Sequence, residues 1–269
     1  MNLLGFVFLV LWLALCARAE SHAFLWSAET GMQDLGTLGG TSSSAAGINN
    51  NGEVVGNSAL ADGTIHPFIW TASSGMVDLG LPRAASFSAV AINSLSHVVG
   101  NGADAKGNQF AYLWTPERGF VRVGAAPGGH NVATGLNDFD EVTGTSYTTT
   151  GSAQAFLWSP GHPQVRHLGV YPGGSLSQGF AFNNLHHVAC FGHTHPLAGP
   201  DNAPFFVVLQ YAKASGWKIL GGIDFGTFPA ANNDHDTVVG HTSDTFALDK
   251  AVDFINGGII SISLATALS

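Results

Sequence analysis

The sequence predicts an all-β fold, a β-propeller of about five to six four-stranded blades built from repeats of about 44 residues. The first observation behind this prediction is the string HAFLW, which recurs as HPFIW, FAYLW and QAFLW and ends at Trp26, Trp70, Trp114 and Trp158. The second is that each repeat holds four short β-type segments between Gly, Asn, Asp and Pro turn signals, with no helical period. A β-solenoid is the main alternative, although its coils are usually shorter.

Each repeat is predicted to form one blade. In the first blade the four segments read AAGIN at 45–49, EVVGN at 53–57, HPFIW at 66–70 and GMVDLG at 75–80. The predicted blades cover residues 41–80, 84–124, 128–169, 173–221 and 225–263. Residues 22–36 carry the first HAFLW and GMQDLG and are left over, so they form half of a sixth blade or close the ring.

Composition limits the classes of partner. The chain has 269 residues, 45% of them hydrophobic, and can bury a sizeable core. Only 10% of the residues are charged, and the formal net charge is −9. Nine Lys and Arg residues without a basic cluster exclude nucleic acid as a partner, because phosphate binding needs several cations on one face.

The first 19 residues differ from the rest and are predicted to be a secretory signal peptide. Residues 3–15 form an apolar run that is too short for a comfortable membrane span, and small residues stand just before Glu20 at the two positions that a signal peptidase reads. Cleavage there leaves residues 20–269 as a single secreted domain, extracellular or periplasmic, with no stable membrane span. An uncleaved anchor and lipid attachment at Cys16 are the alternatives.

Cys190 is the single cysteine that remains after cleavage, so it cannot form an internal disulfide. We interpret it as a small buried residue in a strand. The alternative is a catalytic thiolate with a partner among His186, His187 and His193, which lie nearby in the sequence.

The repeated strings resemble the extracellular HAF repeat family, which is named for this triplet. The resemblance covers nearly all of residues 20–263 and rests on the HAFLW, GMxDLGxLGG and AxGINxxGxVVG strings. It implies a secreted or surface bacterial repeat protein with a propeller-like fold. It implies no activity, because the family has no assigned chemistry.

Most repeated residues have a structural interpretation. The Phe and Trp of each HAFLW string alternate along a strand, so we expect them to fill the core between the sheets. An asparagine opens the turn between the first two strands of each blade and is expected to accept a hydrogen bond from the backbone two residues on. These asparagines are Asn49, Asn93, Asn137, Asn183 and Asn233.

Two of these turns carry carboxylates on alternate residues and are the predicted metal sites. They place Asp138 beside Asp140, and Asp234 beside Asp236. Hard oxygen ligands at that spacing suit Ca²⁺, which is the cofactor that the sequence suggests. Solvated turn carboxylates are the alternative, because the later bidentate Glu of a calcium loop is missing.

Histidines gather where the repeats are least regular, at residues 192–201 and 241–250. His193 and His195 would place both imidazoles on one side of an extended segment. With His241 or Asp201 they would provide three metal ligands and leave one position for water, an arrangement that also suits Zn²⁺. A metal-bound water is a nucleophile near neutral pH, and exposed loop histidines are the alternative interpretation.

The working hypothesis is a secreted hydrolase that uses a metal, calcium first, to hydrolyse a lactone or small ester such as an acyl-lactone. His193, His195 and His241 would be its catalytic residues, by analogy with calcium-dependent lactonases of the paraoxonase and gluconolactonase types. A non-catalytic extracellular binding or scaffold propeller explains the regular repeats equally well. The sequence does not indicate the oligomeric state.

Overall fold

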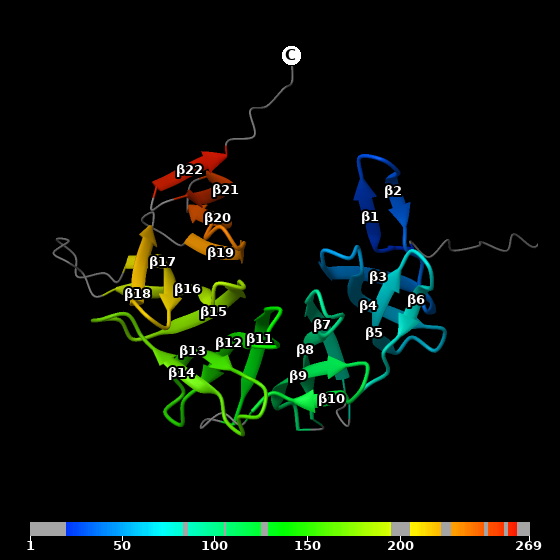
Figure 1. Cartoon of the computed structure of the whole chain (residues 1–269), viewed down its shortest axis with the longest axis horizontal. Helices are drawn as coiled ribbons and strands as arrows, with labels where there is room; N and C mark the ends of the chain where they lie inside the picture. The colour runs from blue at the N-terminus through cyan, green and yellow to red at the C-terminus, as the bar shows by residue number, and fades with distance from the viewer. Residues whose placement is uncertain are drawn as a thin grey trace, which may run out of the picture.

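A computed structural model describes residues 20–82, 86–104, 106–124, 129–194, 205–221, 227–244, 247–255 and 258–262. The strands form five four-stranded antiparallel sheets and one two-stranded sheet. In Figure 1 the sheets follow one another around an arc, with the first strand of each four-stranded sheet toward the middle and the fourth toward the outside. The β-propeller prediction is therefore confirmed.

The strands are short, and consecutive strands pair within each sheet. The half-blade consists of β1 (Phe24–Ser27) and β2 (Gly31–Asp34). Blade 1 consists of β3 (Gly39–Ile48), β4 (Val54–Leu60), β5 (Ile65–Thr71) and β6 (Gly75–Asp78), and blade 2 of β7 (Ser86–Ile92), β8 (Val98–Ala103), β9 (Gln109–Thr115) and β10 (Gly119–Arg122). Blade 3 consists of β11 (Asn131–Leu136), β12 (Val142–Tyr147), β13 (Ala153–Trp158) and β14 (Arg166–Gly169). Blade 4 consists of β15 (Ser177–Phe182), β16 (His187–Thr194), β17 (Phe205–Ala212) and β18 (Gly216–Gly221), and blade 5 of β19 (Thr227–Asn232), β20 (Val238–Asp244), β21 (Ala247–Ile255) and β22 (Gly258–Ile262).

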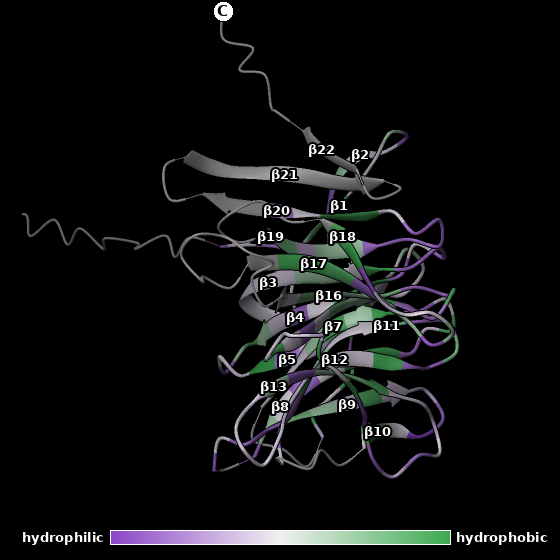
Figure 2. Cartoon of the chain, turned by 90° about the vertical axis from the view of Figure 1, so that its left-hand side faces the viewer, coloured by the Kyte–Doolittle hydropathy of each residue, from purple (hydrophilic) through white to green (hydrophobic). Residues whose placement is uncertain are grey.

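These sheets match the predicted blades closely, because each predicted range contains the four strands of one sheet apart from the first residues of β3. Figure 2 shows apolar residues concentrated in the strands, whereas many of the turns at the right-hand side are hydrophilic. No helix in the described ranges has the length and hydropathy that a membrane span needs. The predicted signal peptide, residues 1–19, lies outside the described residues.

Phenylalanine and tryptophan of the HAFLW strings belong to the core in blades 1 and 3, as predicted, whereas Trp114 of blade 2 is only partly buried. Phe68 in β5 is 0% exposed, and Trp70 is 5% exposed. Phe68 lies opposite Gly56 of β4, and a Cβ on that glycine would come within 2.8 Å of the Phe68 ring. Gly56 therefore leaves room for the Phe68 ring and for the Ser44 carbonyl oxygen, which a Cβ would approach to 2.0 Å.

The half-blade departs from this pattern. Phe24 and Trp26 hold the same positions in β1, but they are 56% and 63% exposed. The expectation that they belong to the core was wrong for this first copy. Among the described strands β1 pairs with β2 alone, so no Val-Val-Gly strand covers these two side chains.

Asparagine side chains hold the turns between the first two strands of each blade. Each Asn accepts a hydrogen bond from the backbone N–H two residues on, at 3.0–3.2 Å, which confirms the predicted role of Asn49, Asn93, Asn137, Asn183 and Asn233. Three of these side chains also donate to the carbonyl of the equivalent Asn in the next blade. The distances are 2.9 Å from Asn49 to Asn93, 3.0 Å from Asn93 to Asn137 and 2.8 Å from Asn183 to Asn233.

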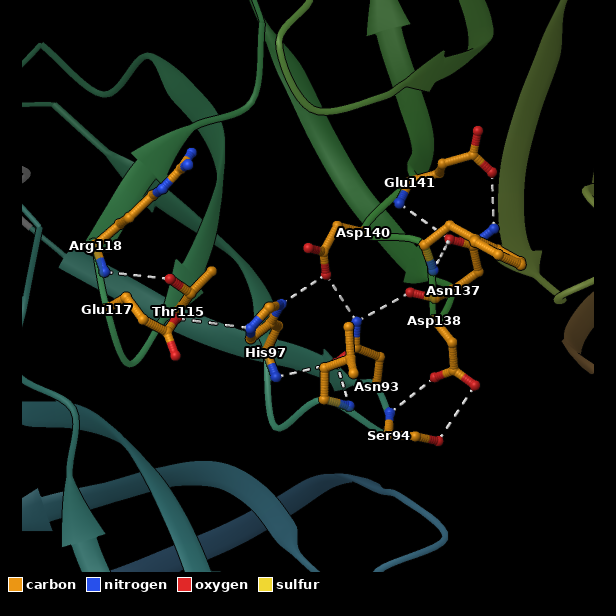
Figure 3. Close-up of polar contacts among 12 residues, drawn as sticks. Asn93, Ser94, His97, Thr115, Glu117, Arg118, Asn137, Asp138, Asp140 and Glu141 are labelled. Atoms are coloured by element: carbon orange, nitrogen blue, oxygen red, sulfur yellow. Dashed lines mark hydrogen bonds and ion pairs between the residues drawn. The ribbon is translucent and has the colours of Figure 1, made fainter.

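A second polar contact crosses each blade junction, and we call it the junction pair. The residue four after the turn Asn of one blade binds the residue three after the turn Asn of the next blade. The pairs are Glu53 with Ser96, His97 with Asp140, Glu141 with His186 and His187 with Asp236, at 2.6, 2.7, 2.5 and 2.7 Å. Figure 3 shows His97 and Asn93 both pointing toward Asp140.

The second member of each pair stands at a turn position with positive φ. The φ values are 62° for Ser96, 60° for Asp140, 61° for His186 and 58° for Asp236, and Gly52 takes the equivalent place in blade 1. Asp tolerates this left-handed conformation better than most residues. Asp140 and Asp236 are thus explained by the turn and by the histidine of the preceding blade.

Candidate functional site

A cavity of about 510 Å³ lies at the junction of blades 3 and 4. Its walls come from the β13–β14 turn, from the β15–β16 turn and from the β17–β18 turn. Leu157, Trp158 and Phe182 line it with apolar surface, and Leu185 stands at its exposed edge. The cavity is large enough for a small ligand, and such sites are usually apolar with a few polar groups that orient the ligand.

A junction pair lies in this cavity. Nδ1 of His186 is 2.5 Å from Oε2 of Glu141, and Ser159 Oγ donates to the other oxygen of Glu141 at 3.1 Å. Asn137 also donates to Glu141, at 2.9 Å. The His186 side chain is half-exposed and its ring stacks on Phe139, with centroids 5.0 Å apart. Glu141 therefore orients His186 through Nδ1, while Nε2 has no protein partner among the contacts in the described residues.

The other charged groups of the cavity are basic. Arg166 begins β14, and its guanidinium carbon lies 5.8 Å from the centre of the Tyr211 ring. Lys213 follows β17, and His162 lies in the β13–β14 turn. Arg166 and Lys213 are two of only nine Lys and Arg residues in a chain with net charge −9. A local excess of cations in an acidic chain favours an anionic ligand.

An equivalent but less basic cavity lies one junction earlier. It has a volume of about 420 Å³ and is lined by Thr115 and Arg118 of blade 2 and by Asp140 and Pro160 of blade 3. Val121 pairs with Leu113 in blade 2, and Arg166 pairs with the equivalent Leu157 in blade 3. The smaller cavity therefore has Val121 in the position that Arg166 holds in the larger one. The junction of blades 3 and 4 is thus the more basic copy of a repeated recess.

The pKa of Glu141 lies below its usual value. Burial raises this pKa, but hydrogen bonds from Asn137 and His186, together with the charge of His186, lower it further than burial raises it. A lowered carboxyl pKa contributes stability above the unfolded value of about 4.3, and this contribution is lost as the pH falls through the folded pKa.

We therefore expect the free energy of unfolding of the Glu141→Gln variant to be lower than that of the unchanged protein from about pH 7 to about pH 5. The difference between the two free energies should shrink below about pH 4. Urea denaturation at each pH measures the difference. A difference that stays the same from about pH 7 through the whole acid range would contradict the lowered pKa, because that contribution must be lost as the pH falls through the folded pKa.

The predicted histidine site is only partly described. His195 and Asp201 lie outside the described residues. The backbone of His193 pairs with Phe206 in the β16–β17 ladder. His241 lies in β20, and its ring stacks on Phe228 with centroids 5.3 Å apart. The metal site of these residues therefore stays a prediction.

The four predicted calcium ligands have protein partners. Asp140 and Asp236 belong to junction pairs and also accept hydrogen bonds from Asn93 and Asn183. Asp138 and Asp234 lie at a polar recess of about 220 Å³ that the asparagine turns of all five blades surround. Asn184 lies between them and donates to Asp138 at 2.9 Å and to Asp234 at 3.0 Å.

No group of three His, Cys, Asp or Glu side chains in the described ranges is arranged to hold a metal ion. The hydrogen bonds at the asparagine turns account for the four aspartates as links between blades. The calcium prediction therefore gains no support from these residues and stays a prediction.

Cys190 in β16 is a buried residue, as interpreted from the sequence. Burial raises the pKa of its thiol far above the ordinary value, and its sulfur lies 3.8 Å from the Val188 carbonyl oxygen. A catalytic thiolate needs a lowered pKa and access to substrate, so the alternative interpretation was wrong.

No protein-family model and no curated protein matches the sequence, so the resemblance to HAF repeats stays a prediction. Solved β-propellers match the fold. TolB from Acinetobacter baumannii aligns with a TM-score of 0.52 at 14% identity, over 80% of this chain and 50% of TolB. The chain thus spans half the length of TolB.

The β-propeller domain of the Trilobed protease from Pyrococcus furiosus aligns with a TM-score of 0.50 at 9% identity, over 82% of this chain and 71% of that domain. A gluconolactonase from Xanthomonas campestris aligns with a TM-score of 0.44 at 10% identity, over 82% of this chain and 76% of the enzyme. At these identities the likeness shows the fold alone.

The cavity was missed in the sequence because its two polar partners come from different repeats. Glu141 and His186 follow different turn asparagines and meet only when blades 3 and 4 pack together. The sequence does contain a signal for these pairs. The fourth residue after the turn Asn of one repeat and the third residue after the turn Asn of the next repeat have side chains that can hydrogen-bond to each other.

Proposed function

We propose that this chain is an extracellular binding propeller whose cavity between blades 3 and 4 takes a small anionic ligand, with acidic sugars as the best-fitting class. The observation that carries the proposal is the pairing of apolar walls with Arg166 and Lys213. Sugar rings present apolar faces that pack on such walls, and a carboxylate on the ring complements the cations.

Arg166 has the chemistry to specify the ligand. A guanidinium can bind a carboxylate with two parallel hydrogen bonds, whereas the Lys213 ammonium acts as a point charge. The ring of Tyr211 lies beneath the Arg166 guanidinium and restricts its motion. Ligand binding should therefore weaken with ionic strength, because both cations are exposed.

Isothermal titration calorimetry with oligogalacturonates and with neutral oligosaccharides of the same length tests the proposal. The Arg166→Gln, Lys213→Gln double variant should bind oligogalacturonate at least about tenfold more weakly, the equivalent of about 1.4 kcal/mol. Arg122→Gln is the matched control, because Arg122 is exposed and stacks on an aromatic ring, Phe110, at 3.6 Å, outside the cavity.

Arg122→Gln should leave the affinity unchanged. Equal affinity for neutral and acidic oligosaccharides would overturn the choice of ligand class. Unchanged affinity in the double variant would show that the cavity is not the binding site.

Hydrolysis of a lactone or small ester in the same cavity is the second candidate, because Glu141 orients His186 with Nε2 free to accept a proton. A general base needs this combination of orientation and access. Nε2 would take a proton from water as the water oxygen attacks the substrate carbonyl. The predicted dependence on calcium belongs to this candidate.

A panel of acyl-lactones and p-nitrophenyl esters, assayed with and without a chelator, tests the second candidate. His186→Gln should abolish turnover, and His241→Gln should abolish it if the predicted histidine site is the catalytic one. Absence of turnover on every substrate leaves binding as the function and rejects hydrolysis by His186.

A further inference from the structure

We propose that the cavity between blades 2 and 3 is a second binding site, and that it takes a primary ammonium group carried on an apolar, ring-sized body. The proposal rests on the apolar walls of this cavity, on the two carboxylates that line it and on one strand position where it differs from the cavity between blades 3 and 4. It goes beyond the proposed function, because it concerns another junction and a ligand of opposite charge.

The apolar walls of this cavity, which has a volume of about 420 Å³, belong to the core. Leu113 of β9 is 4% exposed and Trp158 of β13 is 5% exposed, and both are part of the core cluster that spans blades 2 and 3. Trp158 Nε1 donates to the His162 carbonyl oxygen at 2.7 Å and so holds the β13–β14 turn, whose Pro160 forms another wall. A recess with walls fixed by the core is formed before a ligand binds, which lowers the entropic cost of binding.

A junction pair brings the first carboxylate into this cavity. Asp140 accepts hydrogen bonds from His97 at 2.7 Å and from Asn93 at 2.9 Å, and both go to its Oδ1. In the described part of the chain, Oδ2 of Asp140 accepts no side-chain hydrogen bond, although this side chain is only 21% exposed. A carboxylate oxygen that is largely removed from water favours a charged donor, and the ammonium group of a ligand is such a donor.

The second carboxylate, that of Glu117, comes from the β9–β10 turn. Its Oε2 lies 3.9 Å from Nε2 of His97, whereas Nδ1 of the same ring binds Asp140. Figure 3 shows the His97 ring between these two carboxylates. Two acceptors therefore flank one imidazole at the same cavity.

The formal charge of this cavity is opposite to that of the larger one. Two carboxylates, Glu117 and Asp140, and one guanidinium, Arg118, give it a charge of −1 when its histidine is neutral. The cavity between blades 3 and 4 has one carboxylate and two cations, which give +1 on the same basis. Val121 also stands where the larger cavity has Arg166. A negative recess with apolar walls favours a cation on an apolar body over an anion.

Isothermal titration calorimetry of the full chain at about pH 7 with two ligands of similar shape, phenethylamine and 2-phenylethanol, tests the proposal. An alkylammonium group stays protonated at this pH. The chain should bind phenethylamine saturably and the neutral alcohol at least about tenfold more weakly, because the alcohol lacks the charge-assisted hydrogen bond.

Two substitutions locate the binding, and each has a matched control. Val121→Arg puts a guanidinium into the cavity and should abolish phenethylamine binding. Val77→Arg should leave it unchanged, because Val77 holds the same strand position in blade 1, opposite Ile69, and lies outside this cavity. Glu117→Gln should weaken binding at least about threefold, whereas Glu29→Gln, which removes the same charge from the β1–β2 turn, should not.

Equal affinity for the amine and the alcohol, or no saturable binding of the amine, would overturn the proposal. Unchanged affinity of the Val121→Arg variant would also overturn it, because the amine would then bind elsewhere on the chain. All four substituted side chains are exposed, so the variants should fold like the unchanged chain, which circular dichroism checks.

Discussion

The Phe68→Ala variant is expected to lose about 3–5 kcal/mol of unfolding free energy, because it leaves a cavity in the core of blade 1. Phe68 is 0% exposed and packs against the backbone of Gly56 in the neighbouring strand. Phe24→Ala removes the same side chain from the same position of the string, but this side chain is exposed. It should cost less than about 1 kcal/mol.

Urea denaturation of both variants beside the unchanged chain measures the two losses. The repeat makes the comparison an internal control, since β1 and β5 share their sequence pattern. A large loss in Phe24→Ala would show that another part of the chain covers the half-blade in solution. Equal small losses would contradict the burial of Phe68.

The Asn93→Ala variant is expected to lose about 2–4 kcal/mol, because it removes four hydrogen bonds worth about 1 kcal/mol each and leaves buried partners unsatisfied. The Asn93 carboxamide accepts from Leu95 and His97 and donates to Asn137 and Asp140. It thus holds its own turn and ties blade 2 to blade 3, as Figure 3 shows.

Asn51→Ala is the control for this prediction. Asn51 also donates across a junction, to Ser94 at 3.0 Å, but its contact is exposed to solvent. Its removal should cost less than about 1 kcal/mol, because water replaces the lost partner. Similar losses in the two Asn variants would mean that the buried link contributes no more than the exposed one.

The sequence predicted the fold well because the repeat is a local signal. Each copy contains its own strands and turns, and the positions of Trp26, Trp70, Trp114 and Trp158 set the period before any long-range contact is known. The turn role of the five asparagines could be assigned for the same reason, since the hydrogen bond that defines it spans only two residues.

The exposure of the first copy could not be predicted in this way. The string around Phe24 is as good a core strand as the string around Phe68, and only the presence or absence of a neighbouring strand separates them. Burial here depends on pairing between distant segments, which the pattern of a single strand does not encode.

The candidate site could not be predicted from the sequence for a related reason. Attention to irregular loops led to His193 and His241, whereas the described cavity is built from regular turns that meet at a junction. Its distinctive members, Arg166 and Lys213, are ordinary surface cations in the sequence. Only the packing of blades 3 and 4 shows that these two cations lie beside the same apolar recess.

A crystal structure of the chain soaked with an oligogalacturonate tests the central claim most directly. We expect density for the sugar between blades 3 and 4, with its carboxylate within hydrogen-bond distance of Arg166. Density at the asparagine-lined recess around Asp138 and Asp234, with the cavity between blades 3 and 4 empty, would contradict the account.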